Sequence, residues 1–317
     1  MPVTFGCSLP SRGPMASPLA LRSLAQRAEE LGFDSAWVSD HIILPRQVDS
    51  FYPYSPDGVP VFSPDQPYYD PLSTLNFLAG CTQRLRLGTH VLIIPYRNPV
   101  LTAKMVATLD TLSEGRVTLG IGVGWMEEEF KALGLDTFAE RGEVTNEYLR
   151  LFKELWTKED AEFNGRFVKT SGVGFLPKPV QQPHPPIWIG GHTGPALRRA
   201  AELGDGWMPI GLRPPAILEP EELAAKIAQL RRLTVRAGRP EDAVTPCFST
   251  DIVFDRSLGP DRRMMHGVPE QIAADLRQYQ DLGVQNFILG FPASSVEGQR
   301  EAMEQFSREV MPLIPQG

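Results

Sequence analysis

The sequence predicts an α/β fold of the (β/α)8 class, a TIM barrel, built as one domain that spans residues 1–317. Short runs rich in β-branched and aromatic residues alternate with longer amphipathic segments, and this alternation occurs eight times. No shift in composition marks a boundary between two domains. A doubly wound sheet is the alternative, but it usually has fewer strands and a second domain, so the barrel is favoured.

The predicted strands are short apolar runs, each followed by a turn or loop and then by a helical pattern. An Asn-Gly pair between aromatic residues also predicts a small β-hairpin at 162–167. The eight barrel strands are expected at 3–9, 34–40, 85–94, 116–122, 186–191, 205–210, 245–254 and 285–291.

The predicted helices carry the usual start and stop signals. The first ends at Gly32, and Pro71 and Pro195 lie in first turns, where a missing backbone N–H costs nothing. The helices are expected over about 18–31, from near 71, over 99–112, 126–133 and 139–157, from about 195, 221 and 269, and over 296–310.

Composition excludes several function classes. A formal charge of -7 and a pI near 5.4, without a Lys/Arg cluster, argue against a nucleic-acid partner. No apolar run approaches the roughly 20 residues of a membrane helix, and the N-terminus does not resemble a signal peptide. The three distant cysteines and five scattered histidines predict neither a disulfide framework nor a metal site. We therefore expect a cytoplasmic protein with a small-molecule substrate.

The stretch "GRVTLGIGVGWMEEEF" (115–130) places glycines at 120, 122 and 124 on the fourth strand. It is not a dinucleotide fingerprint, because Trp125 stands where the third glycine would be needed. The glycines either let a flat or phosphorylated ligand approach the backbone or relieve crowding inside the barrel. The stretch alone leaves both interpretations open. Glutamates 127–129 suit the first turn of a helix, and at least two of them are expected to be solvated.

The catalytic end of a (β/α)8 barrel lies at the carboxyl ends of its strands. Asp40 and His41 follow the second strand, and an imidazole there can act as an acid, a base or a hydrogen-bond donor. A turn cap and an ordinary loop residue are the alternative for this pair. Gly190 and Gly191 precede a helix start, where free backbone N–H groups bind anions.

Four segments resemble the luciferase-like flavin and deazaflavin oxidoreductases, in the same order and over about 170 residues. The segment "WVSDH" resembles the Asp-His pair of that family. The segments "LGTHVLIIPYRNP" and "LDTLSEGRVTLGIGVGW" resemble its third and fourth strands. The segment "IWIGGHTGPALRRAAELGDGW" resembles its fifth strand, phosphate turn and sixth strand.

The resemblance implies a barrel that holds a flavin-type ring at its mouth and the phosphate arm between strands four and five. It implies a cis peptide between His90 and Val91 in a bulge that supports the ring, with the backbone of His90 rather than its imidazole toward the ring. His41 is then the catalytic residue, with Asp40 orienting the site. The backbone of five further residues is expected to contact the phosphate arm: Gly122, Gly124, Trp125, Gly190 and Gly191.

The segment "GVGWMEEEF" resembles the branch that uses the deazaflavin coenzyme F-420, which carries hydride without activating oxygen. FMN with oxygen, in a monooxygenase of the same fold, is the alternative. Sugar-phosphate dehydrogenases of the family have a glutamate where this chain has Trp125, so that substrate class is not expected. Two other classes remain: a catalytically silent flavin-binding barrel and a phosphosugar-handling barrel without flavin.

An insertion at about 45–69 follows Asp40 and His41 and is rich in proline and aromatic residues. Such loops at barrel mouths often act as lids or substrate walls, which indicates a hydrophobic organic substrate. A contact in a homodimer, which we expect this protein to form, is the alternative role. The lid tyrosines would be Tyr52, Tyr54, Tyr68 and Tyr69.

Overall fold

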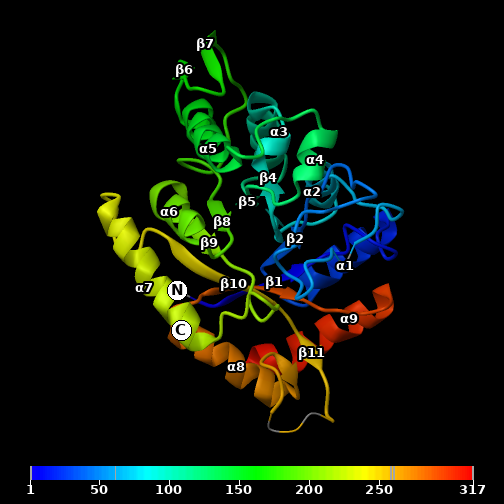
Figure 1. Ribbon diagram of the computed structural model, residues 1–317. Coiled ribbons are helices and arrows are strands. Elements are labelled where there is room, and N and C mark those ends of the chain that lie inside the picture. The colour runs from blue at the N-terminus through cyan, green and yellow to red at the C-terminus, as the bar shows by residue number, and fades with distance from the viewer. Residues whose placement is uncertain (1, 61, 258, 260, 316–317) are drawn as a thin grey trace.

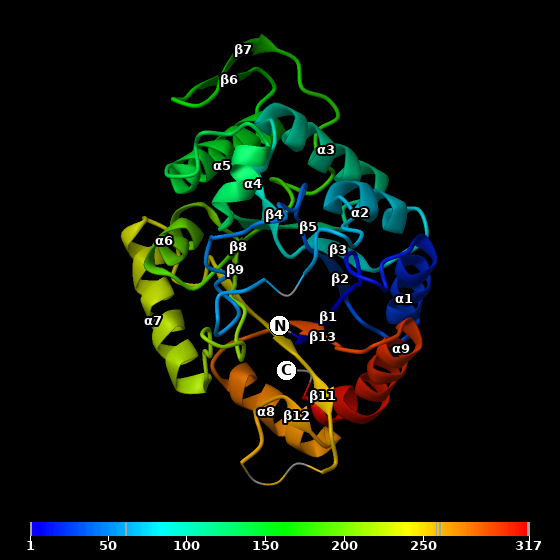
Figure 2. The same cartoon turned by 45° about the vertical axis from the view of Figure 1, so that its right-hand side comes forward.

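A computed structural model describes residues 2–60, 62–257, 259 and 261–315. Eight parallel strand positions form a closed barrel, and helices between the strands form an outer ring (Figure 2), which confirms the predicted fold class. All eight predicted strands are present in the predicted order. They are β1 (Thr4–Ser8), β2 (Ser35–Val38), β3 (Arg86–Thr89) continued by β4 (Leu92–Ile93), β5 (Val117–Gly122), β8 (Ile187–Gly190), β9 (Gly206–Met208), β10 (Thr245–Asp251) and β13 (Asn286–Gly290).

The barrel closes where β3 pairs with β5, with Leu87 opposite Val117. At the other end of the chain, β1 pairs with both β2 and β13, so the first and last strands are neighbours. The third strand position is interrupted at residues 90–91, and β4 resumes the pairing with β5. This interruption lies at the carboxyl end of the barrel, beside the end of β2.

Four helices begin with side-chain caps that the sequence analysis did not name. Side-chain oxygens of Ser17, Asp70, Asn98 and Ser295 accept backbone N–H groups in the first turns of these helices. Within the described ranges, no helix is long and apolar enough to cross a membrane. The helices are α1 (Pro18–Glu30), α2 (Pro71–Ala79), α3 (Pro99–Leu112), α4 (Glu127–Ala132), α5 (Arg141–Thr157), α6 (Gly194–Leu203), α7 (Pro220–Arg236), α8 (Pro269–Asp281) and α9 (Val296–Gln305), with short turns η1 (Ile94–Tyr96), η2 (Phe306–Val310) and η3 (Met311–Leu313).

The predicted hairpin is present, but its turn differs from the expected two-residue Asn-Gly turn. Strands β6 (Ala161–Asn164) and β7 (Lys169–Val173) are joined by a four-residue loop and extend beyond α5 (Figure 1). The carboxylate of Glu147 on α5 accepts the backbone N–H groups of Arg166, Phe167 and Val168 at 2.7–2.8 Å. This tertiary contact, which the local sequence does not encode, selects the longer loop. A second small pairing, β11 (Val253–Phe254) with β12 (His266–Gly267), was not predicted.

Large side chains fill the barrel interior. The rings of Trp37 and Trp188 stack with centroids 5.5 Å apart and pack beside Met208, Cys247 and Ile288. At Gly120 the strands approach so closely that a Cβ atom would lie 2.0 Å from the carbonyl oxygen of Thr89. Gly120 therefore relieves crowding inside the barrel, one of the two interpretations that the sequence left open.

We expect Gly120→Ala to lower the free energy of unfolding by about 1–3 kcal/mol, because the new methyl group meets backbone that cannot move aside. Gly174→Ala is the matched control, since no heavy atom lies within 4 Å of its Cβ position. Urea unfolding followed by circular dichroism measures both. Equal midpoints for the two variants would contradict the packing described here.

Candidate functional site

The carboxylate of Asp40, at the end of β2, lies in a buried ion pair. Its two oxygens accept hydrogen bonds from both terminal nitrogens of Arg97, at 2.6 and 2.8 Å. Its Oδ2 also accepts a hydrogen bond from the backbone N–H of Ile93. Arg97 also donates to Asp70, the N-cap of α2. Burial acts against the charge of Arg97, but its bonds to the two carboxylates raise its pKa overall. Asp40 therefore holds β4 and α2 against the end of β2.

His41 makes its hydrogen bond to a residue that the sequence analysis missed. Its Nδ1 lies 2.5 Å from Oε2 of Glu129, and both side chains are buried. Glu129 also accepts the hydroxyl of Tyr96 at 2.9 Å and the backbone N–H groups of Ile42 and Ile43. The expectation was that Asp40 orients this site. In the structure Glu129 holds His41, whereas the hydrogen bonds of Asp40 go to Arg97 and Ile93.

The spacing of residues along α4 could have identified Glu129 as a buried residue. Met126, Glu129 and Phe130 share one face of the turn, and all three are fully buried. An acidic residue between two large apolar residues on a core-facing stripe is unusual, and such a residue needs partners.

The expectation that at least two of the three glutamates are solvated needs correction. Glu127 pairs with Lys131 at the surface, but Glu128 accepts the backbone N–H groups of Asp49 and Ser50 at 2.9 and 3.0 Å. The loop after β2 folds over the start of α4, and its unpaired N–H groups recruit these carboxylates.

The structure contains the cis peptide between His90 and Val91 that the family resemblance implied. The side chain of Val91 lies over two glycines, because a Cβ atom on Gly122 or Gly190 would approach it within 2.5 or 2.8 Å. At Gly124, a Cβ atom would meet Phe130 at 2.8 Å. The missing side chains thus make room for neighbouring protein atoms. A cofactor contact at the backbone of these glycines stays a prediction.

The imidazole of His90 packs against the interior of the barrel. It packs edge-on to Trp37, and its Nε2 is buried without a hydrogen-bond partner among the described residues. Burial lowers the pKa of this imidazole to about 4, and the charge of nearby Arg213 acts in the same direction. His90 is therefore neutral near pH 7, with a buried nitrogen that no described residue pairs.

This pKa predicts an acid-sensitive contribution to stability. The unfolded chain binds a proton at His90 near the ordinary value of about 6.5, while the folded protein does so only near 4. The contribution of neutral His90 to the free energy of unfolding is therefore complete above about pH 7. This contribution, on the order of 3 kcal/mol, is lost as the pH falls to about 4. Urea unfolding as a function of pH should show a shallower loss for His90→Gln than for wild type. Parallel curves would refute this assignment.

The amino end of α6, which follows β8, has the features of an anion-binding site. The Cβ direction of Gly191 is open, with only Ala196 near it, and the N-cap residue Thr193 makes no side-chain capping bond. Nδ1 of His192 is buried without a partner in the part of the chain that the structure describes. Lys226 of α7 donates to the carbonyl oxygen of His192 at 3.2 Å and brings positive charge to this end.

The described parts of the insertion, 45–60 and 62–69, run across the area enclosed by the helix ring in Figure 2. Its rings pack on the site: Phe62 and Tyr68 lie 4.9 and 5.4 Å from the His41 ring, and Tyr52 lies 5.1 Å from that of Trp125. We call this group of rings the mouth cluster; it consists of His41, Tyr52, Phe62, Tyr68 and Trp125.

The two other predicted lid tyrosines differ from each other in position. Tyr54 packs edge-on to Tyr52 of the mouth cluster, and burial raises its pKa to about 12. Tyr69 instead packs against the main hydrophobic core, and its backbone N–H donates to Ser11. Three of the four tyrosines therefore lie in or against the mouth cluster, and their role as a lid stays a prediction.

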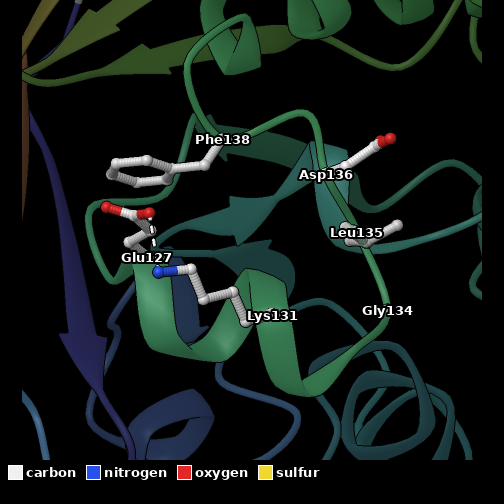
Figure 3. Close-up of a pocket in the computed structure, with 6 residues that line it drawn as sticks. All are labelled: Glu127, Lys131, Gly134, Leu135, Asp136 and Phe138. Atoms are coloured by element: carbon white, nitrogen blue, oxygen red, sulfur yellow. Dashed lines mark ion pairs between the residues drawn. The ribbon is translucent and has the colours of Figure 1, made fainter.

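A cavity of about 420 Å³ lies on α4 and the loop after it (Figure 3). Glu127 and Lys131 point toward each other at its edge, and Figure 3 shows the Phe138 ring on the same side as Glu127, with Leu135 and Asp136 on the other. None of its lining residues belongs to the mouth cluster. Among the described residues, no group of three or more His, Cys, Asp or Glu side chains could hold a metal ion.

Comparison with known proteins places the chain in a family. Residues 3–258 match the family described as luciferase-like monooxygenase. The chain belongs to this family. This is a family of oxidoreductases and monooxygenases.

Three similar proteins illustrate the range of this luciferase-like family. An uncharacterized protein of Mycobacterium tuberculosis is 35% identical over 84% of this chain and 83% of its own length. The F420-dependent glucose-6-phosphate dehydrogenase of Amycolatopsis mediterranei is 26% identical over 94% of this chain and 95% of its own length. A monooxygenase of Streptomyces bottropensis shares the fold with a TM-score of 0.78 at 22% identity, over 98% of this chain and 99% of that one.

Proposed function

We propose that this protein is an oxidoreductase that transfers hydride between coenzyme F-420 and a small, hydrophobic organic substrate. The observation that carries the proposal is the placement of His41, whose ring lies in an aromatic mouth beside the His90–Val91 bulge and is held through Nδ1 by Glu129. This leaves Nε2 for a ligand. An imidazole so placed can exchange a proton with a reacting group near neutral pH.

The residues present fit a phosphorylated flavin-type cofactor. The open backbone at Gly191, the uncapped start of α6 and Lys226 would hold a phosphate group, and the buried Nδ1 of His192 has a polar partner to gain. The bulge at His90 and Val91 would support the ring. When bound, coenzyme F-420 supplies a site that accepts or donates hydride.

His41 would then manage the proton that accompanies hydride transfer. The surrounding rings of Phe62, Tyr68 and Trp125 exclude water from the imidazole, which strengthens its interaction with a polar substrate atom. The same rings form an apolar wall, which supports a hydrophobic substrate and a lid role for the insertion.

The choice of cofactor rests on the family branch. The relative from Amycolatopsis mediterranei is named as F420-dependent, which supports coenzyme F-420, whereas the similarity to a monooxygenase keeps reduced FMN with oxygen as the second candidate. The notion of a sugar-phosphate substrate is disfavoured, because Trp125 packs in the mouth cluster at the position where a glutamate was expected in such enzymes.

Cofactor titration tests the binding half of the proposal. We expect coenzyme F-420 to bind more tightly than FMN, and Gly191→Val to weaken binding at least tenfold, because its side chain would cover the N–H groups of the α6 start. Lys226→Gln leaves the glycine turn intact and should also weaken cofactor binding, because it removes a positive charge. The difference in affinity from wild type should become smaller at high salt, which screens that charge. Tighter binding of FMN would favour the monooxygenase, and unchanged affinity in both variants would remove this phosphate site.

Turnover tests the catalytic half. With a panel of hydrophobic alcohols, carbonyl and enoyl compounds, we expect His41→Ala to lower kcat by about 10²–10⁴-fold, since general acid–base catalysis is worth about that much. Cofactor affinity should change far less. Wild-type turnover in this variant from acid to alkaline pH would make His41 an ordinary loop residue, and binding without any turnover in wild type would indicate a silent barrel.

A further inference from the structure

We infer that Glu129 is a positioning residue that fixes the tautomer of His41, with the proton on Nδ1 and the lone pair of Nε2 directed to the barrel mouth. The use of this lone pair in catalysis rests on the function proposed above. The tautomer itself does not, because it follows from contacts within the protein.

The first step concerns the charge of Glu129. A fully buried carboxylate is costly unless donors surround it, and here the donors are present on both oxygens. Oε1 accepts the backbone N–H groups of Ile42 at 2.7 Å and Ile43 at 3.2 Å. Backbone N–H groups can only donate, so they favour the ionised, acceptor form of the acid.

The second step concerns Oε2, which lies between Tyr96 and His41. Burial raises the pKa of the Tyr96 phenol, and the charge of Glu129 raises it further, so this hydroxyl keeps its proton and donates. With Tyr96 donating to an ionised carboxylate, the 2.5 Å contact to His41 also requires a donor. Nδ1 must therefore carry the proton, and in the neutral ring Nε2 carries the lone pair.

The third step concerns the surroundings of Nε2. No hydrogen bond to this atom is formed by any described residue, and the nearest rings belong to Phe62, Tyr68 and Trp125. A neutral His41 therefore meets a ligand as a base. A proton released by a substrate O–H or N–H goes to Nε2, and the resulting imidazolium keeps its Nδ1–H bond to Glu129. In the opposite direction Nε2–H returns that proton.

Nitrogen NMR of protein with ¹⁵N-labelled histidine tests the tautomer without cofactor or substrate. The chain has five histidines, so the His41 signals can be assigned by their loss in His41→Gln. In alkaline buffer, where the ring is neutral, we expect a protonated Nδ1 and an unprotonated Nε2 in wild type. Observation of the opposite tautomer in wild type overturns the inference, even if the Glu129 variant described next does not fold.

Two variants separate positioning from general structure. Glu129→Gln removes the ionised acceptor and should restore a mixture in which Nε2–H is populated, whereas Glu128→Gln, one position away on the same turn, should leave the His41 signals unchanged. In turnover assays Glu129→Gln should lower kcat at least tenfold and alter the pH profile, with unchanged cofactor affinity. An unchanged tautomer in Glu129→Gln refutes the role of Glu129. Absence of turnover in wild type, with the expected tautomer, refutes the proposed function alone.

Discussion

The buried ion pair between Asp40 and Arg97 is the interaction on which the geometry of the mouth depends. It joins three elements that are distant in sequence, because Asp40 ends β2, the Ile93 amide that it accepts belongs to β4, and Arg97 reaches the cap of α2 through Asp70. Removing one partner of such a pair leaves a buried charge and typically costs about 3–5 kcal/mol. The pair fixes where the residue after Asp40 leaves the barrel, and that residue is His41.

The same constraint explains the spacing of glycines on the fourth barrel strand. Holding Ile93 against Asp40 places the preceding bulge inward, so that Val91 lies over the ends of β5 and β8. Only strands without side chains at 122 and 190 leave room for its methyl groups. The glycines at 122 and 190 thus provide the space that the Val91 side chain requires. A dinucleotide-binding motif should therefore not be inferred from their spacing.

Periodicity and strand ends predicted the barrel and the location of His41, because both follow from local pattern and from the rule that barrel sites lie at carboxyl strand ends. The role of Glu129 could not be derived in the same way. In a run of three glutamates, only the path of the loop after β2 decides which carboxylates receive its N–H groups. The contributions of His192 and Lys226 were missed for a related reason, since Lys226 is brought to α6 by packing of α7 and not by any local motif.

The division of roles between Glu128 and Glu129 has a consequence for how the site is held. One carboxylate holds the loop at Asp49 and Ser50, and its neighbour holds His41 with the two residues that follow. Because separate carboxylates carry the two sets of bonds, a change at Glu128 releases the loop at Asp49 and Ser50 without removing the bond to the imidazole. The anchoring of the loop and the orientation of the ring are therefore two separate constraints on the mouth.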